Sequence, residues 1–73
     1  MSNEKKKPLT DETVVYEPTG PSGNAYWILG MTTIALKRSG HADKVEEYNR
    51  RATSGDYENL LKVTGEYVVL KAV

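Results

Sequence analysis

Apolar positions in this chain alternate between a strand-like and a helix-like spacing, and the changes of spacing define five elements. Short runs of β-branched and aromatic residues near both ends indicate strands. Between these runs, apolar residues recur three and four positions apart, which is typical of amphipathic helices. The predicted order is strand, three helices, strand, over residues 13–17, 25–39, 42–53, 57–64 and 66–73.

Capping and turn residues mark the helix boundaries. Asn24 and Asp56 are good N-caps, because their side-chain oxygens accept hydrogen bonds from free N–H groups of the first turn. The Pro- and Gly-rich stretch 18–23 predicts a tight loop before the first helix. Gly65 is typical of a residue that ends a helix. The alternative at this last boundary is that residues 67–68 extend the third helix.

These elements predict a small α+β domain of order β-α-α-α-β over residues 12–73. A ribbon of two strands is marginally stable in water. The helices must therefore pack on one face of the two short terminal strands, or strands of a second subunit must extend the ribbon. Residues 1–11 are polar and lysine-rich without apolar periodicity, so we expect a flexible tail.

The first helix is apolar nearly all round, and such helices are buried on more than one side. The chain has only 73 residues, of which 38% are hydrophobic, with no Cys and one His. A domain this small usually needs a disulfide, a metal or a partner subunit. The composition removes disulfides and Cys/His zinc sites. We therefore expect a homo-oligomer whose subunit contact includes Trp27, Met31 and Ile34.

Charge and motif content exclude several function classes. Ten basic and ten acidic residues give a net charge of zero, whereas nucleic-acid-binding proteins usually carry a basic excess. No segment approaches the ~18 apolar residues of a membrane span, and the lysine-rich start lacks a signal-peptide core. His41 lies in a helix–helix turn, and the sequence around it offers no nucleophile that His41 could activate as a general base. We expect a cytoplasmic protein without catalytic residues, metal, cofactor, nucleic-acid partner or membrane partner.

Two predicted helix starts combine features of an anion-binding site. A Gly-rich loop before a helix presents free N–H groups and the positive end of the helix dipole, so we expect backbone amides there to hold a phosphate. Aromatic side chains in the first turns can stack a base, and an arginine fork suits phosphate. The alternative is that the same residues only cap helices or fill the core. The candidate ligand residues are Gly23, Asn24, Tyr26, Trp27, Arg51, Ser54, Asp56 and Tyr57.

Two blocks of this sequence carry a resemblance to a family. Gly-Asn-Ala-Tyr-Trp-Ile-Leu-Gly at 23–30 and Ser-Gly-Asp-Tyr-Glu-Asn-Leu-Leu at 54–61 resemble very short phage and prophage proteins. Members share Gly-Asn-Ala-Phe, then Ser-Gly-Asp-Tyr-x-x-Leu-Leu and a Tyr-Val strand, and the similarity covers roughly residues 13–71. Tyr26 stands where the family usually has Phe, and Asn59 where it has Asp or His.

The phage context implies a class of function. Small, cysteine-free, oligomeric phage proteins with pockets between subunits are similar in kind to nucleotide sponges. The resemblance thus implies an anti-defence protein that binds and sequesters a small nucleotide immune signal, a cyclic dinucleotide or a cyclic ADP-ribose type, without turnover in the bacterial cytoplasm. The alternative is a protein–protein inhibitor that blocks a host defence enzyme through the apolar helix face.

Overall fold

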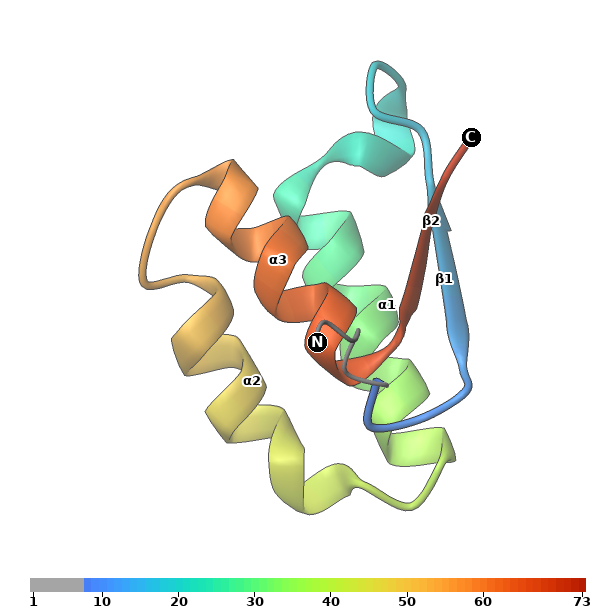
Figure 1. Ribbon diagram of the computed structural model, residues 1–73, viewed down its shortest axis with the longest axis vertical. Coiled ribbons are helices and arrows are strands. Elements are labelled where there is room, and N and C mark those ends of the chain that lie inside the picture. The colour runs from blue at the N-terminus through green and yellow to red at the C-terminus, as the bar shows by residue number, and fades with distance from the viewer. Residues whose placement is uncertain (1–7) are drawn as a thin grey trace, which may run out of the picture.

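The structure is a computed structural model, and it describes residues 8–73. It shows an α+β fold of three helices and two parallel terminal strands (Figure 1). The predicted order of strand, three helices, strand is confirmed. In chain order the elements are β1 (Thr13–Tyr16), the 3₁₀ turn η1 (Pro21–Gly23), α1 (Ala25–Arg38), the 3₁₀ turn η2 (Ala42–Lys44), α2 (Val45–Ala52), α3 (Tyr57–Tyr67) and β2 (Val69–Ala72).

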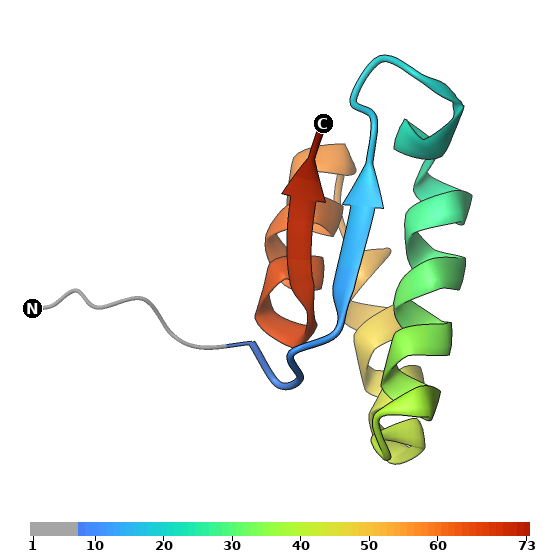
Figure 2. The ribbon, with the colours of Figure 1, turned by 90° about the vertical axis from the view of Figure 1, so that its right-hand side faces the viewer.

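The two terminal strands pair with each other within one chain. The pairing is parallel, with Thr13 opposite Val69 and Tyr16 opposite Ala72. Parallel neighbours need a long crossover connection, and the three helices between the strands supply it. Figure 2 looks onto the outer face of the ribbon, with α1 beside β1 and the other helices behind the strands. The helices thus pack on one face, as the pattern predicts.

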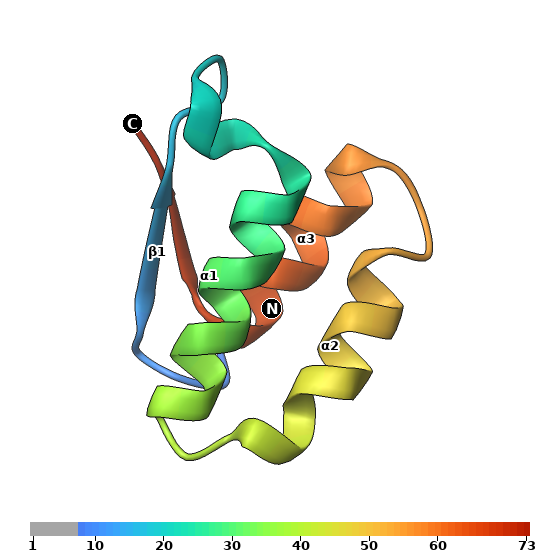
Figure 3. The same ribbon diagram turned by 180° about the vertical axis from the view of Figure 1, so that it is seen from behind.

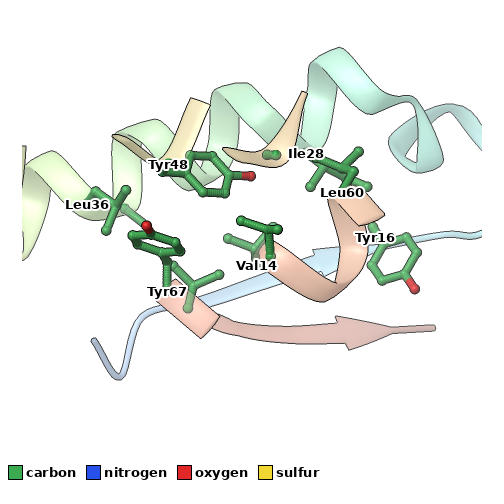
Figure 4. Close-up of a cluster of buried hydrophobic side chains, with 11 residues drawn as sticks. Val14, Tyr16, Ile28, Leu36, Tyr48, Leu60 and Tyr67 are labelled. Atoms are coloured by element: carbon green, nitrogen blue, oxygen red, sulfur yellow. The ribbon is translucent and has the colours of Figure 1, made fainter. Parts of the chain in front are cut away.

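The core lies between this ribbon and the helices (Figure 4). Val14 and Tyr16 point inward from β1 because alternate side chains of a strand face opposite sides. Ile28 and Leu36 of α1 are fully buried. Leu60 and the two aromatic residues of α2 and α3 close the cluster, with the Tyr48 and Tyr67 rings edge to face at 5.1 Å.

A buried pair of hydroxyls bridges α2 and α3 inside this core. The Tyr48 hydroxyl lies 2.7 Å from Thr64 Oγ1, and both residues are fully buried. Burial raises the pKa of Tyr48. The nearby Thr32 hydroxyl of α1 is also fully buried and has no hydrogen-bond partner in the part of the chain that the structure describes. The described core therefore holds one hydrogen-bonded pair of hydroxyls, Tyr48 and Thr64, and one hydroxyl without a partner, Thr32.

Two predicted boundaries are wrong. α3 continues through Gly65 and ends at Tyr67, so the last strand begins at Val69 and not at 66. The alternative at this boundary, an extended third helix, is confirmed as far as Tyr67. Gly65 does not have the positive φ of a helix-ending glycine, and the packing of Tyr67 against Tyr48 holds the last turn in helical form. The region 42–53, expected as one helix, is divided into the turn η2 and the helix α2.

The N-terminal boundary of the domain also moves. Of the expected tail, residues 1–7 lie outside the described residues, but residues 9 and 10 are attached to the fold. The Leu9 and Thr10 N–H groups donate to the carbonyl oxygens of Glu66 and Tyr67, at 3.1 and 3.0 Å. The last carbonyls of a helix lack partners within the helix, so the end of α3 supplies acceptors that the sequence pattern does not reveal.

Candidate functional site

The first turns of α1 and α3 lie side by side (Figure 3). The Tyr57 hydroxyl at the start of α3 donates to the carbonyl oxygen of Gly23, just before α1. The two residues are 34 positions apart in the chain. The two predicted helix starts therefore meet within a single chain.

A pocket of about 270 Å³ lies between these helix starts. Such a volume is slightly below the usual range for small-molecule sites, so it suits one ring system of a ligand better than a whole dinucleotide. Tyr26, which is 83% exposed, lies at the rim of this pocket. The only charged side chain in its lining is Asp56. The lining residues are Ala25, Tyr26, Leu29, Ala52, Thr53, Gly55, Asp56, Tyr57 and Leu60.

Both predicted N-caps are confirmed. Asn24 Oδ1 accepts from the Tyr26 N–H at 2.7 Å, and Asp56 Oδ1 accepts from the Asn59 N–H at 3.0 Å. Because a carboxylate favours the positive end of a helix, Asp56 neutralises the start of α3 itself. The anion-binding character of the site therefore rests on α1 alone.

The amide groups expected to hold a phosphate are already used. The Gly23 N–H donates to Gly20 O at 3.0 Å, and the Asn24 N–H donates to Pro21 O at 3.2 Å, because the loop folds into the turn η1. Among residues 8–73, the N–H groups of Ala25 and Trp27 have no acceptor. These two amides are the free donors at the start of α1, and Ala25 also lines the pocket.

The structure does not bring Arg51 into the pocket. Its Nη1 donates to the Tyr67 hydroxyl at 3.2 Å, and its Nη2 lies 2.8 Å from Glu66 Oε1. These contacts raise the pKa of Arg51, with the Tyr67 hydrogen bond the larger cause. They point the guanidinium toward the end of α3, whereas the pocket lies at its start. The Ser54 hydroxyl donates to Arg51 O and also lies outside the lining.

The arginine belongs to a separate cluster on the surface of α2 and α3. The Tyr67 hydroxyl donates to Glu47 Oε2, and this hydrogen bond is the main cause that lowers the pKa of Glu47. The Arg51 guanidinium also lies over the Tyr67 ring, 5.8 Å from its centre. The geometry explains this cluster as a structural tie between two helices.

The sequence analysis does not predict six of the lining residues, and four of these six are apolar: Ala25, Leu29, Ala52 and Leu60. Leu29 follows Ala25 by one turn of α1, and Leu60 follows Asp56 by one turn of α3. Both leucines also pack toward the core, and their place in the pocket depends on how the two helices meet. A signal existed in their spacing, since residues four apart share one helix face.

The third predicted set, Trp27, Met31 and Ile34, lies on the outer face of α1. These side chains are 37%, 36% and 49% exposed in the single chain, although all three are large and apolar. Trp27 is not among the residues that line the pocket, whereas Tyr26 and Tyr57 are. A contact between subunits on this face stays a prediction.

Comparison of the chain with protein-family models, with curated proteins and with solved structures gives no match. The resemblance to short phage proteins therefore stays a prediction. In the described part, residues 8–73, no helix combines the length and apolar character needed to cross a membrane. Over the same residues, no group of three or more His, Cys, Asp or Glu side chains is placed to hold a metal ion.

Proposed function

We propose that this chain is a binding protein that holds a small nucleotide without turnover, with the base in the pocket between the starts of α1 and α3. The observation that carries the proposal is the tie between Tyr57 and Gly23, which unites two helix starts and two tyrosines around one hollow. The phage anti-defence role in the cytoplasm of a bacterial host follows from the resemblance and is part of the proposal.

The chemistry of the lining suits a nucleobase. Tyr26 and Tyr57 offer aromatic faces, and stacking of a base on such a ring contributes about 1–3 kcal/mol. The Asp56 carboxylate can accept a hydrogen bond from an exocyclic amino group, because its cap uses only one of its oxygens. The N–H groups of Ala25 and Trp27, which have no acceptor among residues 8–73, would donate to a phosphate on the α1 side.

Calorimetric titration with cyclic dinucleotides and cyclic ADP-ribose isomers tests the proposal. We expect one of these ligands to bind with a dissociation constant below about 10 μM. Tyr26→Ala, at an exposed position, should weaken that binding at least about tenfold, the loss of one stacked base. Arg51→Ala is the matched control outside the pocket and should leave affinity unchanged. Failure of every ligand to bind overturns the proposal.

Absence of turnover is tested separately. The bound nucleotide should be recovered intact after long incubation and denaturation of the protein, as measured by mass spectrometry. Recovery of a cleaved product would replace the binding protein with an enzyme.

A second candidate function uses the outer face of α1. The exposure of Trp27, Met31 and Ile34 favours a protein partner, and an inhibitor of a host enzyme would present such a face. The two functions differ in thermal unfolding. A nucleotide that binds only the native state raises the melting temperature, whereas an inhibitor of this kind predicts no such shift.

A further inference from the structure

Gly30 lies in the middle of the exposed apolar face of α1. It is the sixth residue of a 14-residue helix, and it is exposed. A glycine within a helix is destabilising relative to alanine, because it loses more backbone freedom on folding. A Cβ at this position would meet nothing within 4 Å. Nothing within residues 8–73 therefore requires a glycine there.

The surroundings of Gly30 differ from those of the other exposed helical glycine. Gly65 of α3 also has open space at its Cβ position, but it lies between the exposed Lys62 and Glu66. Gly30 is flanked by large, exposed apolar side chains on the adjoining turns, namely Tyr26, Trp27, Met31 and Ile34. A glycine inside an apolar face lets another backbone come close, and this combination points to a helix crossing.

We propose that a second copy of this chain packs its α1 antiparallel against the first, with the two helices crossing at Gly30. Two identical helices related by a two-fold axis present the same patch to each other. The register then places Tyr26, four residues before Gly30, opposite Ile34 of the second copy, four residues after it. Ile34 of the second copy then meets Tyr26 at the rim of the pocket, and one side of the Tyr26 ring stays toward the pocket for the base.

Charge favours the antiparallel direction. Lys37 and Arg38 end α1. Arg38 is paired with Glu12 at 2.8 Å, so parallel copies would chiefly bring the two Lys37 side chains together. Antiparallel copies separate the two Lys37 residues by 14 positions, about 21 Å along the helix, and bring each lysine to the loop before α1 that holds Glu17.

The same register completes the pocket, a step that rests on the proposed function. Lys37 follows Tyr26 by 11 residues, close to three helical turns, so both lie on the same side of α1. Gly23 and Lys37 are each seven residues from Gly30. Lys37 of the second copy would therefore stand beside the free amides at the start of α1. It supplies the cation that the pocket of one chain lacks, and it suits a nucleotide phosphate.

Cross-linking tests the crossing point. The chain has no cysteine, so Gly30→Cys creates a single thiol at the proposed axis. Two such thiols form a disulfide only if their Cα atoms lie about 4.4–6.8 Å apart. Under mild oxidation, we expect Gly30→Cys to form a covalent dimer at least about tenfold faster than the control Gly65→Cys. Equal rates overturn the proposal.

Sedimentation equilibrium tests the interface without a cross-link. Wild type should be dimeric at about 100 μM, a concentration that populates even modest complexes. Gly30→Leu has room within the chain, so the fold should be kept while the dimer weakens at least about tenfold. Gly65→Leu should leave the dimer unchanged. A monomeric wild type overturns the proposal, and circular dichroism verifies that each variant is folded.

The role of Lys37 is measured on the dimer. Lys37→Gln should weaken nucleotide binding about tenfold and reduce its dependence on salt, while the Gly30→Cys cross-link still forms with Lys37→Gln present. Unchanged nucleotide affinity overturns the placement of Lys37. If no nucleotide binds wild type, the proposed function fails, and the cross-linking result still decides the interface.

Discussion

The Tyr57 hydroxyl donates a hydrogen bond to the carbonyl oxygen of Gly23 at 2.5 Å. The contact joins the start of α3 to the loop before α1. The backbone of Glu17 also lies close to Gly23. A Cβ at this position would lie 2.3 Å from Glu17 O, so a larger residue would clash there. The place of Gly23 in the candidate site is therefore structural, since it accepts from Tyr57 and leaves room for the folded loop.

Tyr57→Phe should separate the two helix starts without removing the aromatic ring. Loss of one hydrogen bond lowers the free energy of unfolding by about 0.5–1.5 kcal/mol, and we expect weaker nucleotide binding because the pocket loses its fixed width. Urea unfolding and calorimetric titration measure the two effects. Tyr26→Phe is the control, since Tyr26 is highly exposed and its hydroxyl has no partner among residues 8–73. Equal losses in both variants would contradict the importance of the tie.

The buried pair of Tyr48 and Thr64 should show coupling in a double-mutant cycle. Tyr48→Phe leaves the Thr64 hydroxyl buried without its partner, and Thr64→Val leaves the Tyr48 hydroxyl in the same state. Each single change should cost about 1–3 kcal/mol, because a buried unsatisfied group keeps its full desolvation penalty. The double variant should cost less than the sum, with a coupling of about 0.5–3 kcal/mol from urea unfolding. Simple additivity would show that the hydroxyls do not interact.

Glu47 should make the free energy of unfolding depend on pH in the acid range. The Tyr67 hydrogen bond lowers its pKa below the ordinary value of 4.5. Its stabilising effect is therefore fully present above that ordinary value, and it is lost as the pH falls through the lower pKa of the folded state. Glu47→Gln should flatten the fall of unfolding free energy in this acid range, whereas Glu46→Gln, the same charge change at an exposed neighbour, should not. If the free energy of unfolding falls with pH in the same way in both variants, ionised Glu47 does not stabilise the fold through Tyr67.

Local signals account for what the sequence predicted well. Asn24 and Asp56 act on amides two and three residues away, so residue type and position suffice to identify them as caps. The order of strands and helices follows from the spacing of apolar residues, which is also local. Tyr26, Asp56 and Tyr57 each lie in the first turn of a helix or cap it, and the structure places all three in the lining of one pocket; ligand binding by these residues stays a prediction.

Long-range contacts account for what the sequence predicted poorly. The position of Arg51 near a helix start in the chain predicts a phosphate contact, but Tyr67 and Glu66, 16 and 15 residues later, bind its guanidinium. Gly65 is typical of a residue that ends a helix, but α3 continues to Tyr67, whose ring packs against Tyr48. Neither partner is visible from local spacing.

Asp56 distinguishes capping from ligand contact, because two substitutions separate the roles. Its carboxylate caps α3 through Asn59 and is also the one charge in the pocket lining. Asp56→Ala removes both roles and should lower the free energy of unfolding by about 1 kcal/mol, the usual value of an N-cap. Asp56→Asn keeps a capping oxygen, so the free energy of unfolding should stay close to that of wild type.

The two variants should differ from wild type in what they bind. Asp56→Asn removes the negative charge, and a hydrogen bond to a charged acceptor is stronger than one to a neutral acceptor. We therefore expect lower affinity for nucleotides whose base offers an amino group, and a smaller change for a uracil-containing cyclic dinucleotide. Asn24→Ser, a cap exchange at α1, is the matched control and should leave this selectivity unchanged. If Asp56→Asn binds every ligand as wild type does, Asp56 is a cap alone, and the base must be recognised by the two tyrosines.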